Sequence, residues 1–128
     1  MSIETLKGLR VLVAEDEALV AMDITDTVEF EGAEVIGPFA TSREARVAVD
    51  GSCFDIAILD VRLEDGDVFP VADVIRDREI PIVFHSGHLD PAQISNRYPN
   101  ACFCSKPSTP EGLVNALLAA RQEAETAG

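Results

Sequence analysis

The chain has 128 residues, 47% of them hydrophobic, which suffices for one domain with a full core. Its 23 acidic and 10 basic residues give a formal net charge of -13, and no basic run is visible, so nucleic-acid binding is not expected. The apolar runs are too short for a membrane span, and the first residues lack the pattern of a secretory signal. We therefore expect a cytoplasmic protein whose three cysteines are reduced.

Strand-length apolar runs alternate with helix-like segments along the first half of the chain. Leu9–Ala14 is the first expected strand, and a helix over Ala18–Glu31 follows it. Glu34–Gly37 is a short second strand that Pro38 should end. Thr41-Ser42-Arg43-Glu44 matches a capping box and predicts a helix to about Asp50.

The same alternation continues through the second half. A third strand is expected at Ile56–Asp60, followed by a loop with turn chemistry at 63–67 and a helix to about Asp77. The remaining expected elements are a strand at Ile82–Ser86, a helix from Asp90-Pro91 to about Arg97, a strand at Ala101–Ser105, and a helix from Ser108-Thr109-Pro110-Glu111 to about Glu125.

Five strand–helix repeats predict an α/β fold. Right-handed crossovers would place the strands in one parallel, doubly wound sheet with helices on both faces. We expect a single domain over residues 1–128, with its core at about 8–125.

Charged side chains follow three of the expected strands. Glu15-Asp16 follows the first strand, Asp60 ends the third, and Lys106-Pro107 follows the last. Ligands bind outside the carboxyl ends of the strands in open parallel sheets, so these residues should converge on one crevice. Clustered carboxylates repel each other unless a cation is present, which favours a hard divalent metal and leaves one carboxylate as a nucleophile towards phosphorus.

Five matches, in order along the chain, give it a resemblance to the receiver domain of two-component response regulators. They are Glu15-Asp16, Asp60, Ser86, Phe103 and Lys106-Pro107, and the resemblance covers about residues 8–125. It implies the flavodoxin-like strand order 2-1-3-4-5. The segment from Phe84 to Gly87 is similar to the Phe-Ala-Thr-Gly loop of a group of single-domain receivers, with His85 and Ser86 in place of Ala and Thr.

The resemblance implies a role for each matching residue near the phosphorylation site. Asp60 would be the phosphoacceptor, and Lys106 would place its ammonium against the phosphoryl oxygens. Asp16 would bind Mg²⁺ directly, Glu15 would act through water, and the backbone carbonyl of Arg62 would be a further ligand.

The resemblance also implies a conformational switch. The hydroxyl of Ser86 would bind a phosphoryl oxygen after Asp60 is modified, and the ring of Phe103 would fill the space that Ser86 leaves. Arg62 and His88 would border the phosphoryl group and tune its lifetime.

We expect a stand-alone receiver that takes a phosphoryl group from a sensor histidine kinase or a histidine phosphotransfer protein and signals to a downstream effector protein. Two alternatives remain open. One is a metal-dependent phosphohydrolase, although Arg62 occupies the place where many such enzymes have a second acid and cannot act as a general acid. The other is a degenerate receiver that serves only as a docking module.

The last expected helix carries two apolar stripes. Leu113, Leu117 and Ala120 should pack on the sheet, whereas Val114 and Leu118 lie about 100° round the helix. This second stripe predicts either a contact face for a homodimer or an effector, formed with the helix at 91–97 and the strand Ala101–Ser105, or packing against that short helix.

Overall fold

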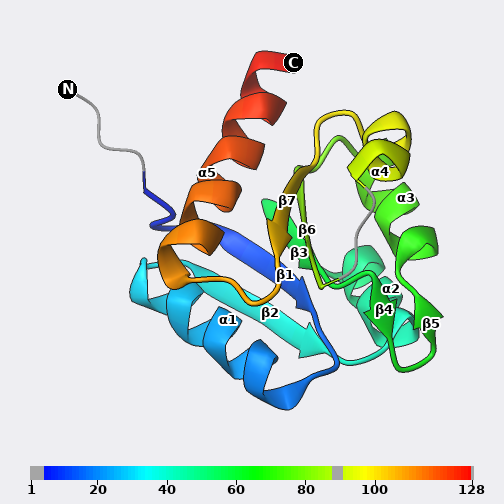
Figure 1. Ribbon diagram of the computed structural model, residues 1–128, viewed down its shortest axis with the longest axis horizontal. Coiled ribbons are helices and arrows are strands. Elements are labelled where there is room, and N and C mark those ends of the chain that lie inside the picture. The colour runs from blue at the N-terminus through cyan, green and yellow to red at the C-terminus, as the bar shows by residue number, and fades with distance from the viewer. Residues whose placement is uncertain (1–4, 88–90, 128) are drawn as a thin grey trace.

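The computed structural model of the protein describes residues 5–87 and 91–127. Five parallel strands form one sheet in the order β2-β1-β3-β6-β7, which is the predicted order 2-1-3-4-5 (Figure 1). The strands of the sheet are β1 (Arg10–Ala14), β2 (Glu34–Phe39), β3 (Ile56–Leu59), β6 (Ile82–Ser86) and β7 (Cys102–Ser105). The helices are α1 (Ala18–Phe30), α2 (Ser42–Gly51), α3 (Phe69–Asp77), α4 (Pro91–Arg97) and α5 (Pro110–Ala127).

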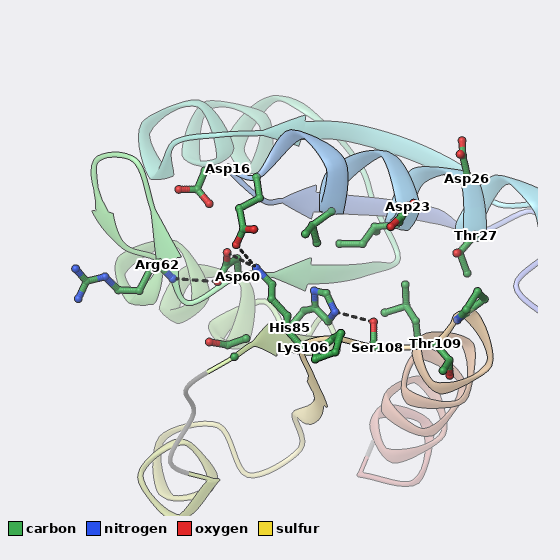
Figure 2. A pocket seen from close by; sticks show the side chains of 18 residues that line it. Asp16, Asp23, Asp26, Thr27, Asp60, Arg62, His85, Lys106, Ser108 and Thr109 are labelled. Carbon is green, nitrogen blue, oxygen red and sulfur yellow. Dashed lines mark hydrogen bonds and ion pairs between the residues drawn. The ribbon is translucent and has the colours of Figure 1, made fainter.

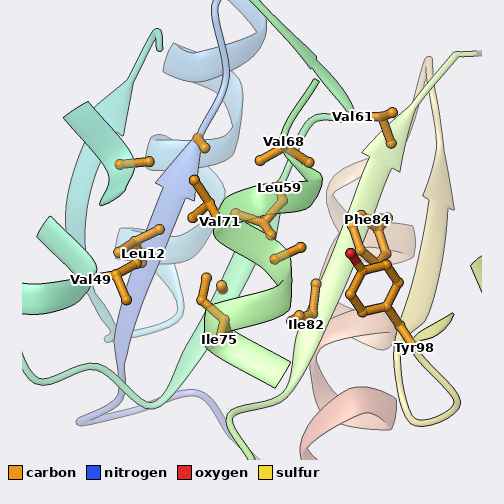
Figure 3. Close-up of a cluster of buried hydrophobic side chains, with 14 of the residues drawn as sticks. Leu12, Val49, Leu59, Val61, Val68, Val71, Ile75, Ile82, Phe84 and Tyr98 are labelled. Atoms are coloured by element: carbon orange, nitrogen blue, oxygen red, sulfur yellow. The ribbon is translucent and has the colours of Figure 1, made fainter. Parts of the chain in front are cut away.

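Helices cover both faces of the sheet, as predicted. Alternate side chains of a strand point to opposite faces, so Leu12 of β1 packs towards α2 and α3, whereas Val13 packs towards α1 and α5. Figure 3 shows part of the first cluster, in which Phe84 of β6 lies against Tyr98. Along the described parts of the chain, none of the helices is both long and apolar enough to cross a membrane.

Two details differ from the sequence-based expectation. We predicted that β2 ends at Gly37, but it continues through Pro38 to Phe39, with an irregular register against β1. β2 lies at the edge of the sheet, where a proline without an N–H is tolerated. Gly37 has φ +113°, and a Cβ there would stand 2.7 Å from the Val13 carbonyl oxygen, so only glycine fits. The expected loop at 63–67 forms a small hairpin of β4 (Arg62–Leu63) and β5 (Gly66–Asp67).

The two stripes of α5 are partly as predicted. Leu113, Leu117 and Ala120 are buried against the sheet. Val114 and Leu118 are half-buried and pack against the hydrophobic cluster that α1, α5 and the sheet share. Ile94 of α4 belongs to the other cluster, so the alternative of packing against α4 is not what the structure shows. Val114 also lines a cavity of about 680 Å³ with Phe30 of α1. The second stripe faces α1 because the two helices cover the same face of the sheet.

The short helix α4 is tied to α3 by the residues at its C-terminal end. Arg97 forms an ion pair with Asp73 at 2.6 Å, and the Tyr98 hydroxyl donates a hydrogen bond to the same carboxylate. The ring of Tyr98 lies 5.0 Å from that of Phe84, centroid to centroid, and the Phe84 ring stacks on Phe103 of β7. The described part of α4 is thus connected to the sheet through an aromatic cluster.

Candidate functional site

The carboxyl ends of the strands bring the predicted charged residues together. β1 ends immediately before Glu15, β3 ends immediately before Asp60, and β7 ends immediately before Lys106. These strands run in parallel, so their ends open at one edge of the sheet. Figure 2 shows the side chains of Asp60 and Lys106 pointing towards one another at this edge, with Asp16 beside them.

The ammonium of Lys106 lies among three carboxylates. Its Nζ is 2.9 Å from Asp60 Oδ2, 2.8 Å from Glu15 Oε1 and 3.3 Å from Glu17 Oε1. The Lys106 side chain is only 15% exposed, so water screens these ion pairs less than it would on the surface. The peptide bond from Lys106 to Pro107 is cis. Glu17 was not among the site residues predicted from the sequence, although its position next to Glu15-Asp16 was the available signal.

Burial and mutual repulsion separate the acidities of the two innermost carboxylates. Burial, the hydrogen bond with Glu15 and the charge of Glu15 raise the pKa of Asp60 to about 6, against the opposing effect of Lys106. Burial also acts to raise the pKa of Glu15, but the neighbouring polar groups of His85, Asp60 and Lys106 outweigh it and lower that pKa to about 2. Burial disfavours the charged ammonium of Lys106, yet both carboxylates keep its pKa above the ordinary value.

The carboxylates offer an all-oxygen ligand set. One oxygen each from Glu15, Asp16, Glu17 and Asp60 lies within 4.8 Å of the others. Oε1 of Glu15 is buried and makes no hydrogen bond within the described residues. Oxygen ligands of this kind suit Mg²⁺, which needs few protein ligands because it keeps several waters. The backbone N–H of Arg62 donates a hydrogen bond to Asp60 Oδ1 at 3.3 Å. The role of the Arg62 carbonyl as a ligand of Mg²⁺ stays a prediction.

A cavity of about 950 Å³ connects this cluster with α1 and the start of α5. Asp60 and Lys106 lie at its inner end, and Asp23 and Thr109 line it farther out (Figure 2). Ser86 also lines this cavity. The cavity leaves Asp60 accessible to a reactant although the residue is only 5% exposed.

The structure places the two predicted switch residues on neighbouring strands. Ser86 is buried at the end of β6, and Phe103 is half-buried on β7. The rings of Phe103 and Phe84 stack with centroids 6.2 Å apart, and Phe84 precedes Ser86 by two residues on the same strand. His88, the other residue predicted to border the phosphoryl group, lies outside the described residues.

A buried pair of polar side chains lies behind the acidic cluster, and no role was predicted for it from the sequence. His85 of β6 is nine-tenths or more buried, and its Nε2 is 2.9 Å from the hydroxyl oxygen of Ser108. The one signal in the sequence was that His85 stands where the similar Phe-Ala-Thr-Gly loop has an alanine.

The fold and the site together define an α/β protein with an acidic, lysine-containing crevice at the carboxyl edge of its sheet. Residues 11–118 match the response regulator receiver domain family, and the chain therefore belongs to that family. The membership agrees with the strand order and with the motifs from Glu15 to Lys106.

Two relatives and a further solved structure illustrate this similarity. The chain is 31% identical to the phyllosphere-induced regulator PhyR of Methylorubrum extorquens over 84% of its own length. SdrG of Sphingomonas melonis superposes with a TM-score of 0.76 at 32% identity, covering 91% of this chain and 98% of that chain. A response regulator receiver protein of Sinorhizobium medicae gives 0.80 at 28% identity, with 94% and 99% covered.

The chain spans 41% of the length of PhyR.

Proposed function

We propose that the protein is a phosphoacceptor receiver whose Asp60 takes a phosphoryl group from a phosphohistidine. The supporting observation is the arrangement of Asp60 and Lys106, with the ammonium 2.9 Å from Asp60 Oδ2 at the inner end of an open cavity. A free oxygen of Asp60 attacks phosphorus, the phosphorus–nitrogen bond of the donor breaks, and an acyl phosphate forms. The histidine nitrogen keeps the electron pair of the broken bond.

Positioning and charge neutralisation supply most of the catalysis in such a transfer. Lys106 holds Asp60 in place and then offers its ammonium to the phosphoryl oxygens. Glu15, Asp16 and Asp60 would hold Mg²⁺, with the Arg62 carbonyl as a further ligand; when bound, the cation neutralises the charge of the carboxylates and of the phosphoryl group. Ser86 binds a phosphoryl oxygen, and Phe103 responds through its contact with Phe84.

The test is incubation with acetyl phosphate and Mg²⁺, followed by intact mass measurement of the parent, Asp60→Asn and Glu29→Gln. Glu29 is an exposed acid on α1 and serves as the matched control. We expect one acid-stable, base-labile phosphoryl group on the parent and on Glu29→Gln, and none on Asp60→Asn. Normal incorporation by Asp60→Asn would contradict the assignment.

The same experiment separates the two alternatives. A metal-dependent phosphohydrolase would release phosphate over many turnovers, and a docking module would neither incorporate nor release it. The acid–aspartate–lysine set argues against a module that has lost its chemistry, and Arg62 argues against a hydrolase that needs a second acid there.

The function implies protein partners in the cytoplasm. The donor would be a sensor histidine kinase or a histidine phosphotransfer protein, and the signal would pass to a downstream effector. A homodimer through the face of α4, β7 and α5 stays a prediction; because Val114 faces α1, that face would have to use other side chains than the second stripe of α5.

A further inference from the structure

A buried histidine bridges the acidic cluster and the loop that carries Lys106. The His85 side chain is 3% exposed and lies between Glu15 and Ser108. Figure 2 shows the contact of its ring with Ser108, at 2.9 Å from Nε2 to Oγ. The other ring nitrogen, Nδ1, points towards Glu15 Oε1 at 3.8 Å.

The two facing atoms are each without a hydrogen bond. Nδ1 of His85 and Oε1 of Glu15 are both buried, and neither has a hydrogen-bond partner among the described residues. Lys106 is 2.8 Å from this Glu15 oxygen, close enough for an ion pair but not aligned as a hydrogen bond. A buried carboxylate oxygen with no donor is unfavourable, so in the metal-free protein this oxygen of Glu15 depends on the charge of Lys106.

Phosphorylation of Asp60, the function proposed above, changes what Lys106 must neutralise. The ammonium now lies among Glu15, Glu17 and Asp60, and a phosphoryl group on Asp60 adds oxygens that compete for it. When Lys106 turns to those oxygens, Oε1 of Glu15 loses its ion pair while it remains buried. A Mg²⁺ ion that Glu15 holds through water would balance part of the charge but would not supply a direct donor to this oxygen. A donor that stands within reach of the same oxygen would remove this penalty.

We propose that His85 is a positioning residue whose Nδ1–H closes onto Glu15 Oε1 when Lys106 engages the phosphoryl group. The Ser108 hydroxyl donates its hydrogen to Nε2, which leaves the single ring hydrogen on Nδ1. No proton is gained or lost in this step. The proposal rests on the proposed function, because it concerns the state in which Lys106 is drawn from Glu15.

The arrangement also ties two segments together. Ser108 lies two residues after Lys106, at the start of the segment that leads into α5, whereas His85 lies on β6 next to Ser86. A closing movement of the ring towards Glu15 therefore acts on the connection between β6 and the β7–α5 loop.

Three substitutions at His85 separate the two ring nitrogens. His85→Leu keeps an apolar side chain without a donor. His85→Asn places an amide nitrogen where Nδ1 stands, and His85→Gln places one near Nε2. With acetyl phosphate at saturating Mg²⁺, we expect His85→Leu to become phosphorylated about tenfold more slowly than the parent. This is the effect expected from the loss of one hydrogen bond to a charged group. His85→Asn should recover to within about threefold of the parent, and His85→Gln should not.

A spectroscopic measurement on the parent needs no substitution. Long-range ¹H–¹⁵N spectra of the imidazole report which nitrogen carries the hydrogen, with and without beryllofluoride and Mg²⁺ as a phosphoryl mimic. We expect a hydrogen on Nδ1 in both states and a downfield shift of its signal with the mimic; Ser108→Ala should mix the two tautomers.

An unchanged Nδ1–H signal in the presence of the mimic, or a parental phosphorylation rate in His85→Leu, would overturn the proposal. If His85→Leu does not fold, the spectra of the parent and of Ser108→Ala decide. A parent that takes up no phosphoryl group would contradict the proposed function itself, which is a different result from normal phosphorylation in all His85 variants.

Discussion

The substitution Asp60→Asn should stabilise the metal-free protein while it abolishes phosphorylation. Burial and the neighbouring Glu15 raise the pKa of Asp60 to about 6, roughly two pH units above the ordinary value of an aspartate. Each unit corresponds to about 1.4 kcal/mol, so ionised Asp60 lowers the free energy of unfolding by up to about 3 kcal/mol. This cost already includes the favourable effect of Lys106. The amide keeps the shape without the charge but does not reproduce every hydrogen bond of the carboxyl group, so we expect a net gain of about 1–2 kcal/mol.

The gain should depend on pH in a defined direction. Above pH 6 the carboxyl is ionised in both the folded and the unfolded state, and the folded state bears the full penalty. Between pH 6 and about pH 4 the folded state binds the proton first, so the penalty fades. Below about pH 4 both states are protonated, and the parent and Asp60→Asn should differ little.

Urea unfolding in EDTA, followed by circular dichroism between pH 4 and pH 7.5, measures this difference. Asp26→Asn removes an exposed acid and should stay within about 0.5 kcal/mol of the parent at every pH. A variant Asp60→Asn that is less stable than the parent at pH 7.5 would show that the ion pair with Lys106 outweighs the cost of burial. A gain that does not change with pH would refute the role of ionisation.

Three further outcomes follow from the geometry. Mg²⁺ should raise the melting temperature of the parent, and Asp16→Ala should remove most of this rise; an unchanged response would place the cation elsewhere. Tyr98→Phe should cost about 1–2 kcal/mol in urea unfolding at pH 7, because the phenol donates to Asp73. Burial opposes the ionisation of Asp73, but hydrogen bonds from Arg97 and Tyr98 lower its pKa. The stability cost of Tyr98→Phe should therefore shrink as acid protonates this carboxylate. A cost that does not change with pH would contradict a hydrogen bond from Tyr98 to ionised Asp73. Phe103→Leu should leave phosphorylation intact and reduce the shifts that beryllofluoride causes in the amide signals of residues 91–97.

The elements were predictable because each strand carries a local signal. A buried parallel strand shows as a short apolar run, and the capping residue Thr41 accepts a hydrogen bond from the Glu44 backbone as its motif predicts. The end of β2 was not predictable, because Pro38 is tolerated only where the strand lies at the sheet edge. That position depends on the order of the strands, which periodicity alone does not determine.

The convergence of the charged residues at one edge of the sheet was also predictable from the sequence. Glu15, Asp16, Asp60 and Lys106 follow strand ends, and topology alone brings strand ends together. The contact between His85 and Ser108 joins residues 23 positions apart through their side chains, and no spacing rule predicts it. The orientation of the second stripe of α5 was missed for a similar reason, since it depends on which helix covers the same face of the sheet.

The charge balance at the sheet edge links the fold to the proposed switch. One ammonium stands within 3.3 Å of three carboxylates, so any new anion at Asp60 must take Lys106 partly from the others. Glu17 is exposed and regains water when this happens, whereas Glu15 is 3% exposed and does not. The cost therefore falls on Glu15, whose facing neighbour is His85, and His85 reaches the segment before α5 through Ser108. A change of charge at Asp60 is in this way connected to that segment by a route separate from the one through Ser86 and Phe103.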